Sequence, residues 1–330
     1  MTMTSKAWVY QQRGMPWEVL SLTTRDTPTF PPLTPLPRDA PEPEEWVLVR
    51  VAYAGLNPGA IFQMTLVPPL VRSRDCVADL DFTGTVIDVW HPEDKPGRFA
   101  RGDKVSGMIP ASHALPTGTG ALAEVIRLPA RYVVAKPASV SLGDAACLLP
   151  GLTARQLVNE SEAKSGDRVL VNAASGGIGT MVVQMVRQVV GENGFIVGVC
   201  SGKNAEMVKG LGVDEVIDYT QHTSVARYIA ERFSDTPFDA VIDTLGHHSL
   251  WLASPAFLKP AGIYESVGIK PPTFYVPDFL RAVWQMQVNA FWPTSRWFGG
   301  VGREWRATSM MSPTLEDRQA VIDMLGSGQC

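Results

Sequence analysis

The chain has 330 residues, of which 45% are hydrophobic and 19% are charged, and its formal net charge is −4. This composition is typical of a globular protein, and the length suits two domains. No block of like charge stands out, so we expect neither a nucleic acid nor an anionic membrane as a partner. No apolar run reaches the roughly 20 residues of a membrane span, and the N-terminus lacks the continuous apolar region of a secretory signal.

Four cysteines are scattered along the chain at positions 76, 147, 200 and 330. No two of them have the CxxC spacing of a metal knuckle or a redox pair. The sequence therefore predicts neither a disulfide framework nor a structural zinc cluster. A reducing compartment, the cytoplasm, is the expected location.

The first part of the chain has the pattern of a mostly β domain. Many prolines between residues 26 and 45 predict an extended loop. Short β-branched runs punctuated by glycine and proline then continue to about residue 137. The strands expected in this part are residues 46–52, 84–89, 103–105 and 132–134.

The pattern changes near residue 141, where short apolar strands begin to alternate with helices. Strands are expected at residues 168–171, 195–199, 215–217, 238–243 and 262–267, with helices at 177–190 and 205–211. Such alternation predicts a parallel, doubly wound α/β sheet. The aromatic residues between Trp284 and Phe298 admit two interpretations. They could pack in a core or in a subunit contact, or they could form the wall of a large apolar substrate pocket.

The strongest motif is VLVNAASGGIG, residues 169–179, which passes from a predicted strand into a predicted amphipathic helix. A turn without side chains lets backbone N–H groups approach a pyrophosphate, and the helix N-terminus adds a favourable field. The motif departs from GxGxxG because Ala174 occupies the first glycine position. A glycine-rich turn without a ligand is the alternative.

The end of the next strand bears on the choice of coenzyme. An NAD-dependent enzyme usually places Asp or Glu there to hold the ribose 2′-hydroxyl. This chain instead has Ser201 and Lys203, and a hydroxyl with a cation suits a 2′-phosphate. The sequence therefore favours NADPH, the alternative for Lys203 being an ordinary solvated side chain.

A competing motif occurs at residues 132–136, which fit YxxxK, the catalytic pair of short-chain dehydrogenases. In that family the pair follows the glycine motif, whereas here it precedes it and ends at a proline. We interpret this segment as a strand.

Eight segments, taken in order, resemble the quinone oxidoreductase and enoyl reductase branch of the medium-chain dehydrogenase/reductase family. They are residues 55–58, 79–84, 102–107, 120–124, 152–154, 174–179, 213–219 and 238–268. The resemblance implies a GroES-like, β-rich catalytic domain over residues 1–142 and an NADPH-binding Rossmann domain over residues 143–286, with the coenzyme in the cleft between. Residues 287–330 would return to the catalytic domain as a segment truncated relative to the family.

The resemblance also implies a set of coenzyme-binding residues. Asn57 and Thr153 would lie near the nicotinamide, although Asn57 also suits a turn before Pro58 and Thr153 a helix surface. Ser175, Gly176, Gly177 and Ile178 would contact the pyrophosphate. The 2′-phosphate and adenosine would be contacted by Ser201, Lys203 and Tyr219, and the nicotinamide end by Val267 and Gly268.

Departures from the family shape the expected chemistry. Zinc-dependent relatives carry a cysteine soon after the position of Gly55 and a histidine near residues 79–81, where this chain has asparagine and carboxylates, so we expect no metal. Phe62 stands close to a tyrosine that some relatives offer as a proton donor, and it cannot donate a proton. His113 is another candidate proton donor, but a lone histidine is more often structural. The catalytic residue therefore stays unassigned, and the proton is expected from water.

These observations predict an NADPH-dependent reductase that passes hydride to a small apolar quinone or α,β-unsaturated carbonyl without zinc. Two alternatives remain open. One is a non-enzymatic NADPH-binding sensor or partner subunit, and the other is a trans-acting enoyl reductase of a polyketide pathway. A homodimer is expected by analogy with the family.

Overall fold

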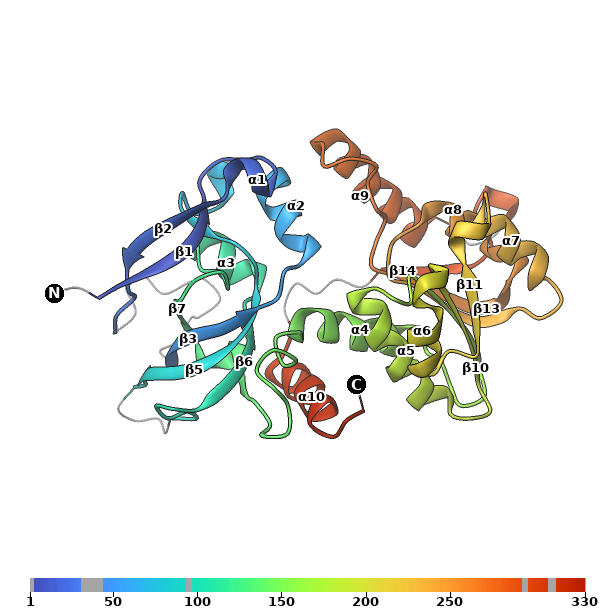
Figure 1. Cartoon of the computed structure of the whole chain (residues 1–330). Helices are drawn as coiled ribbons and strands as arrows, with labels where there is room; N and C mark the ends of the chain where they lie inside the picture. Colours follow the sequence, from blue (N-terminus) through green and yellow to red (C-terminus); the bar gives the residue numbers. More distant parts are fainter. Residues whose placement is uncertain (1–2, 31–43, 93–96, 293–295, 308–312, 330) are drawn as a thin grey trace. The chain divides into compact units, whose positions relative to one another are not determined.

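The computed structural model describes residues 3–30, 44–92, 97–292, 296–307 and 313–329. It divides into two compact units, shown in Figure 1: unit 1 comprises Met1–Leu152 with Met310–Gly328, and unit 2 comprises Thr153–Ser309 with Gln329–Cys330. These boundaries differ from those expected after residues 142 and 286. Much of the predicted loop at 26–45 lies outside the described residues.

Unit 1 is rich in β-structure, as predicted. A sheet of order β2-β1-β4 lies beside a five-stranded antiparallel sheet of order β7-β3-β5-β6-β8. Its core is made by buried side chains of the larger sheet, such as Val49, Phe82 and Leu128. The strands are β1 (Thr4–Tyr10), β2 (Ser21–Asp26), β3 (Trp46–Ala54), β4 (Cys76–Val77), β5 (Asp81–Trp90), β6 (Lys104–Met108), β7 (Val125–Pro129) and β8 (Val133–Ala135).

All four strands expected in this part are therefore confirmed, and the YxxxK segment is strand-like as interpreted. The β1–β2 hairpin was not expected. β1 alternates between exposed and buried residues, but its buried positions include the polar Ser5 and its exposed ones include Trp8, while β2 buries no residue. Short helices connect the strands of unit 1, and they are α1 (Pro16–Val19), α2 (Pro58–Leu66) and α3 (Ala111–Thr117).

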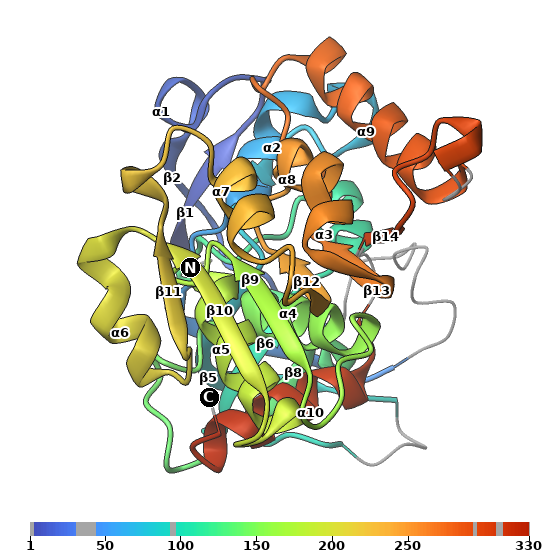
Figure 2. The ribbon, with the colours of Figure 1, turned by 90° about the vertical axis from the view of Figure 1, so that its right-hand side faces the viewer.

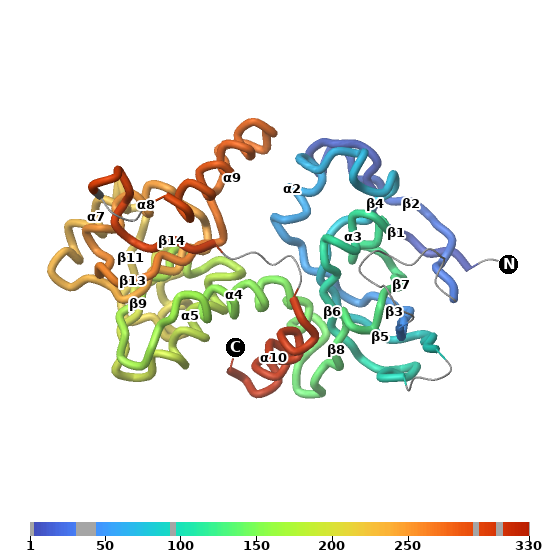
Figure 3. The backbone as a smooth tube through the Cα atoms, turned by 180° about the vertical axis from the view of Figure 1, so that it is seen from behind, coloured from blue at the N-terminus to red at the C-terminus, as the bar shows by residue number. Residues whose placement is uncertain are grey.

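The C-terminal helix α10 (Leu315–Gly326) belongs to unit 1, where it lies beside β8 (Figure 3). Thr314 begins it with a capping box shared with Asp317, which satisfies free N–H groups of the first turn. Val321 and Ile322 are buried with Met108. The buried guanidinium of Arg318 donates to the carbonyl of Met108 at 3.2 Å, so this helix is fastened to the β domain.

Unit 2 contains a six-stranded parallel sheet of order β11-β10-β9-β12-β13-β14 (Figure 2). Numbered from β9, this is the order 3-2-1-4-5-6 of a dinucleotide-binding sheet, so the expected doubly wound fold is confirmed. The strands are β9 (Arg168–Asn172), β10 (Phe195–Cys200), β11 (Glu215–Asp218), β12 (Phe238–Asp243), β13 (Leu258–Ser266) and β14 (Glu304–Ala307).

The helices of unit 2 precede or connect these strands. They are α4 (Leu148–Glu160), whose residues up to Leu152 belong to unit 1, α5 (Gly177–Val190), α6 (Ala205–Gly210), α7 (Val225–Arg232), α8 (His248–Ala253) and α9 (Val276–Phe291). Because β14 pairs in parallel with β13, residues 287–309 remain with unit 2, and only the segment from residue 310 returns to unit 1. The boundary after residue 286 was implied by the family resemblance, and the sequence carries no strong strand signal for β14.

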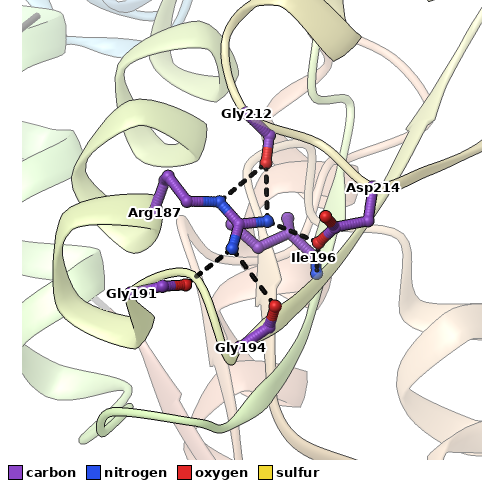
Figure 4. A network of polar contacts seen from close by, with 6 residues as sticks. All are labelled: Arg187, Gly191, Gly194, Ile196, Gly212 and Asp214. Atoms are coloured by element: carbon purple, nitrogen blue, oxygen red, sulfur yellow. Dashed lines mark hydrogen bonds and ion pairs between the residues drawn. The ribbon is translucent and has the colours of Figure 1, made fainter.

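Arg187 on α5 clamps the amino ends of two strands (Figure 4). Its guanidinium donates to the carbonyl of Gly212 from two nitrogens, at 3.0 and 2.8 Å, and to that of Gly191 at 2.7 Å. It also pairs with Asp214, whose carboxylate accepts the N–H of Ile196 at 2.7 Å. This network stabilises the sheet at the edge opposite to the glycine turn.

Most aromatic side chains around α9 are exposed, although residues 293–295 lie outside the description. Trp284 is 70% exposed and Phe291 82%, which is incompatible with the core-packing interpretation.

Among the described residues, no helix is both long and apolar enough to cross a bilayer.

Candidate coenzyme-binding site

The glycine turn between β9 and α5 is built by close backbone packing. Ala173 adopts a left-handed conformation with φ 56°, which is uncommon for a residue other than glycine. Its carbonyl accepts the N–H of Gly176 at 2.9 Å. A Cβ on Gly179 would lie 2.1 Å from that same carbonyl oxygen, so only glycine lets α5 begin so close to the turn.

Ala174, the departure from GxGxxG, is accommodated by a neighbouring strand. Its side chain is fully buried, and a Cβ on Gly198 of β10 would lie 3.1 Å from the Ala174 methyl carbon. The missing side chain of Gly198 thus leaves room for the extra methyl group. The alanine therefore preserves the turn that the motif predicts.

The start of α5 is open to a ligand. A Cβ built on Gly177 would meet no atom within 4 Å, and both Gly176 and Gly177 are exposed. The 14-residue helix α5 directs its free N–H groups and the positive end of its dipole toward this space. Beside it, the hydroxyl of Ser175 accepts from the Asn204 amide at 3.1 Å, which joins the turn to the loop after β10. Ile178 is half-buried in the first turn.

The loop after β10 presents both residues that favoured NADPH. Ser201 directly follows the last residue of β10 and is 9% exposed. Lys203 lies two residues further on, in a short 3-10 turn over Gly202–Asn204, and its side chain is exposed. The two side chains therefore differ in their access to a ligand, and the lysine is the more accessible one.

The sequence argument missed a carboxylate here, because it considered only the end of β10. Asp218, at the end of the adjacent strand β11, lies so close that a Cβ on Gly202 would be 2.4 Å from its Oδ2. Its Oδ1 accepts from the N–H and the hydroxyl of Thr220 at 3.0 and 2.8 Å. These hydrogen bonds lower the pKa of Asp218, so a negative charge stands near the loop. Tyr219 follows it and is 51% exposed.

Asp243 organises the loop after β12. One carboxylate oxygen accepts from the Asn172 amide at 2.7 Å and from the N–H groups of Leu245 and Gly246, both at 3.0 Å. The other accepts from the His247 N–H at 2.7 Å and the Tyr264 hydroxyl at 2.9 Å. Burial and the charge of Asp243 raise the pKa of Tyr264, which therefore stays a donor. Sequence reasoning missed this residue, since a lone Asp at a strand end has no local signal.

The loop after β13 packs against the loop after β12. A Cβ on Gly246 would lie 2.4 Å from the carbonyl oxygen of Gly268. Gly268 has φ 116°, and its N–H donates to the Ser266 hydroxyl at 3.2 Å. Val267 donates its N–H to the Asp243 carbonyl at 3.1 Å. Two loops that start on neighbouring strands thus form one wall.

The structure brings most of the predicted residues to a single edge, the carboxyl ends of β9 to β13 with the loops that follow them. We call it the carboxyl edge. The strand order reverses between β9 and β12, and ligands of open α/β sheets bind at such a switch point. Thr153 instead lies buried in α4, and Asn57 lies in unit 1.

Asn57 is held by two buried carboxylates, which with Gly55 form a cluster that we call the Asn57 corner. The Asn57 backbone N–H donates to Asp79 Oδ1 at 2.9 Å. Its side-chain amide donates to the Gly55 carbonyl at 3.2 Å and to Asp81. Asp79 has a left-handed backbone with φ 60°, a conformation in which Asp is enriched among non-glycine residues.

Burial dominates the acidity of this corner. It raises the pKa of both Asp79 and Asp81 to about 6, and hydrogen bonds from Asn57 oppose the shift. The Leu149 N–H adds a hydrogen bond to Asp81 at 3.3 Å. The two side chains are therefore only partly stabilised as anions by their partners.

Two other residues weighed as proton donors do not gain that role. Phe62 lies in α2. His113 is buried in α3, with its ring 5.3 Å from that of Tyr132 in an edge-on contact, which supports the structural interpretation. Among the described residues, no three His, Cys, Asp or Glu side chains are grouped so that they could hold a metal ion.

Comparisons with known proteins match both units. The model of the alcohol dehydrogenase GroES-like domain matches residues 43–138, and that of the zinc-binding dehydrogenase matches residues 177–295. The medium chain reductase pydE of Acremonium sp. is 31% identical, covering 100% of this chain and 90% of that protein. The trans-enoyl reductase poxH of Penicillium oxalicum is 28% identical, covering 99% and 90% respectively.

Solved structures share the architecture. The quinone oxidoreductase of Pseudomonas syringae pv. tomato is 26% identical with a TM-score of 0.69, covering 98% of this chain and 89% of that one. A mycobacterial protein solved in complex with NADPH is 23% identical with a TM-score of 0.71, covering 99% and 90% respectively. The second likeness shows the fold alone.

Proposed function

Because the chain belongs to the medium-chain dehydrogenase/reductase family, we propose that it is an NADPH-dependent reductase of quinones or α,β-unsaturated carbonyls that works without zinc. The observation that carries this proposal is the open, glycine-lined start of α5 at the switch point of the parallel sheet. That surface suits the pyrophosphate of a dinucleotide, because bare amides and a helix N-terminus face it.

The residues present fit the coenzyme. Ser175, Gly176, Gly177 and Ile178 would hold the pyrophosphate, and Val267 and Gly268 would line the nicotinamide end with Asn57 and Thr153. Bound NADPH would supply the hydride. The chain itself would orient the coenzyme and limit water at the reacting carbon. For an enone, hydride adds to the β-carbon and a proton from water to the α-carbon; for a quinone, hydride and a proton yield the hydroquinone.

The preference for NADPH is supported by Lys203, whose exposed ammonium group is available to a 2′-phosphate. Ser201 and Tyr219 would complete that subsite. Asp218 opposes the preference, because its negative charge would repel a phosphate. We expect the lysine to outweigh it, because the exposed Lys203 side chain can approach the phosphate, whereas hydrogen bonds from Thr220 hold the Asp218 carboxylate in place.

The zinc-free part of the proposal is supported by the chemistry of the Asn57 corner. An amide takes the place of the cysteine thiolate expected in zinc-dependent relatives, and it uses Asp81 as a hydrogen-bond acceptor. Thiolate and imidazole are preferred zinc ligands, whereas an amide donor is not one. The enolate charge would then be met by N–H or hydroxyl donors.

A trans-acting enoyl reductase is the second function supported by a specific observation, the match to the trans-enoyl reductase along nearly the whole chain. In that case the enone would be carried by a polyketide synthase. Capture of an acyl carrier domain by this chain, with reduction of the tethered enoyl group, would favour this function. A free-standing reductase would act equally well on the untethered substrate.

The experiment is coenzyme consumption with a panel of quinones and enones, alongside calorimetric binding of NADPH and NADH. We expect turnover with at least one class and tighter binding of NADPH. Binding without any turnover would overturn the enzymatic proposal and favour the sensor or partner subunit.

Lys203→Ala tests the coenzyme preference. We expect NADPH to bind about tenfold more weakly, which corresponds to the loss of one charge-assisted hydrogen bond, and NADH to be nearly unaffected. Lys209→Ala is the matched control, because this exposed lysine on α6 pairs with Glu206 instead. An equal loss for both coenzymes in Lys203→Ala would show that the lysine does not recognise the phosphate.

A further inference from the structure

Unit 1 holds a small cavity whose residues take no part in the proposed coenzyme site. It lies between the β1–β2 hairpin and the segment that runs from the end of α3 into β7, elements that Figures 1 and 3 show side by side. Its volume is about 190 Å³, below the roughly 300–1,000 Å³ of pockets for drug-sized ligands. A dinucleotide coenzyme is therefore too large for it, and a molecule of a few non-hydrogen atoms fits.

The register of the hairpin brings one guanidinium group to this cavity. Ser5 of β1 pairs with Arg25 of β2, and residues directly opposite each other in an antiparallel pair share a face of the sheet. Ser5 is buried, and both residues line the cavity. Asp26 also borders it, but this residue pairs with the exposed Thr4. Alternation along the strand therefore turns the Asp26 carboxylate toward the opposite face.

A second guanidinium group comes from β7. Val125 and Arg127 alternate with the buried Ile126, so their side chains face away from the core of the larger sheet, and both line the cavity. Arg127 donates to the carbonyl of Thr29 at 2.5 Å, and its guanidinium carbon lies 5.9 Å from the centre of the Trp46 ring. Burial lowers the pKa of Arg127, yet a guanidinium group stays charged at neutral pH. Arg127 is therefore a half-buried cation.

Neither guanidinium group has an anionic partner within the part of the chain that the structure describes. No ion pair to Arg25 or Arg127 is formed there, and the one hydrogen bond that these two side chains donate there goes to Thr29. Two like charges beside one small cavity repel each other, and burial of an unpaired cation costs free energy. An anion bound between the two side chains would offset both effects.

We propose that this cavity is a binding site for a small aliphatic carboxylate, whose oxygens accept hydrogen bonds from Arg25 and Arg127. The planar fork of N–H groups on arginine matches the geometry of a carboxylate. A short carbon chain is favoured over a bare inorganic anion, because Ala7, Val77 and Val125 give the cavity apolar walls. The site lies wholly within unit 1 and does not depend on the coenzyme.

Binding at this site would connect the two sheets of unit 1. Arg25 belongs to the β2-β1-β4 sheet, and Arg127 belongs to the five-stranded sheet. A ligand held by both arginines would therefore bridge the hairpin and β7. Because the ligand binds the folded chain alone, it would also stabilise that chain in proportion to the occupancy of the site.

The first experiment titrates the full chain with butyrate labelled with carbon-13 at the carboxylate, and follows that resonance by NMR. We expect saturable binding that is about tenfold tighter than that of butyramide, which has the same size and no charge. Butyrate should also bind more tightly than acetate, which has less apolar surface. No saturable binding of butyrate, or equal affinity for butyramide, would overturn the proposal. Binding of inorganic phosphate without binding of butyrate would refute the carboxylate assignment.

The second experiment locates the ligand. Arg127→Gln and Arg25→Gln each remove one cation, and we expect each to weaken butyrate about tenfold, the loss of one charge-assisted hydrogen bond. Arg101→Gln is the matched control, because this exposed arginine of unit 1 does not border the cavity, and it should leave the affinity unchanged. An affinity that neither Arg25→Gln nor Arg127→Gln altered would contradict the proposal. If Arg127→Gln did not fold, Arg25→Gln at its exposed position would decide the question.

A third variant distinguishes the cavity from arginine side chains on an open surface. Val125→Phe keeps both guanidinium groups and fills space beside them, so it should abolish butyrate binding. Saturating butyrate should raise the midpoint of thermal unfolding of the unmodified chain by a few degrees and leave that of folded Val125→Phe unchanged. A Val125→Phe variant that bound butyrate as tightly as the unmodified chain would place the ligand outside the cavity, against the proposal.

Discussion

The carboxyl edge of unit 2 and the Asn57 corner of unit 1 both depend on buried carboxylates, but they use them differently. At the carboxyl edge, Asp243 accepts five hydrogen bonds, all from groups of the chain. At the Asn57 corner, the side chain of Asp81 accepts from Asn57 and Leu149, and that of Asp79 from Asn57. The first carboxylate is well satisfied, whereas the other two are sparsely satisfied.

This difference separates two roles for buried charge. A carboxylate with many fixed donors rigidifies the loops around it and presets a binding surface. A carboxylate with few donors keeps a raised pKa and responds to its surroundings. The carboxyl edge is thus preorganised by the chain alone, while the carboxylates of the Asn57 corner keep raised pKa values.

The largest expected effect comes from removing the well-satisfied carboxylate. Asp243→Ala leaves the Tyr264 hydroxyl and three loop N–H groups without their acceptor, so we expect the free energy of unfolding to fall by about 3–5 kcal/mol. Urea unfolding followed by circular dichroism measures this. Asp218→Ala, which removes a less buried carboxylate of the same edge, is the control and should cost far less. Equal losses in the two variants would contradict the organising role of Asp243.

Effects of intermediate size are expected from alanine substitutions at two glycines of the turn, Gly179 and Gly177, which form a matched pair of variants. In Gly179→Ala the new methyl group meets the Ala173 carbonyl at 2.1 Å, so the chain must shift and we expect a loss of about 2–3 kcal/mol of stability. In Gly177→Ala the methyl group enters open space, so stability should change by less than about 1 kcal/mol while NADPH binding weakens. Thermal unfolding and calorimetric titration distinguish the two. If the Gly177→Ala variant bound NADPH normally, the pyrophosphate could not bind at the start of α5.

The smallest effect tests the sparsely satisfied carboxylates by pH. Burial raises the pKa of Asp81 from 3.8 to about 6, so the folded chain binds more protons than the unfolded chain between these values. The free energy of unfolding therefore falls as the pH rises from about 4 to about 6, by on the order of 2 kcal/mol for Asp81, and is level above that range.

Asp81→Asn should make this pH profile shallower, because the amide does not titrate and only the contribution of Asp79 remains. Urea unfolding of both proteins at a series of pH values measures the two slopes. Indistinguishable slopes would mean that the Asp81 carboxyl is not destabilised as an anion in the folded chain. The Asn57 corner would then resemble the carboxyl edge.

Local sequence signals predicted much of the fold. Apolar periodicity placed α5 at residues 177–190, and strand-like runs anticipated β3, β5, β9, β10 and β12. The buried face of α5 includes Val186 and Val190, whereas Val189 is 39% exposed. The signals were weakest for β14, a four-residue edge strand whose pairing with β13 depends on contacts distant in sequence.

By itself the sequence determined the strand–turn–helix motif and the alternation that makes a doubly wound sheet, because backbone conformation and side-chain periodicity are local properties. Tertiary structure alone decided which side chains meet: Gly198 makes room for Ala174, Asp218 reaches the loop after β10, and Asp81 turns the Asn57 amide. Such neighbours are set by sheet order and register, which depend on pairings across long stretches of chain.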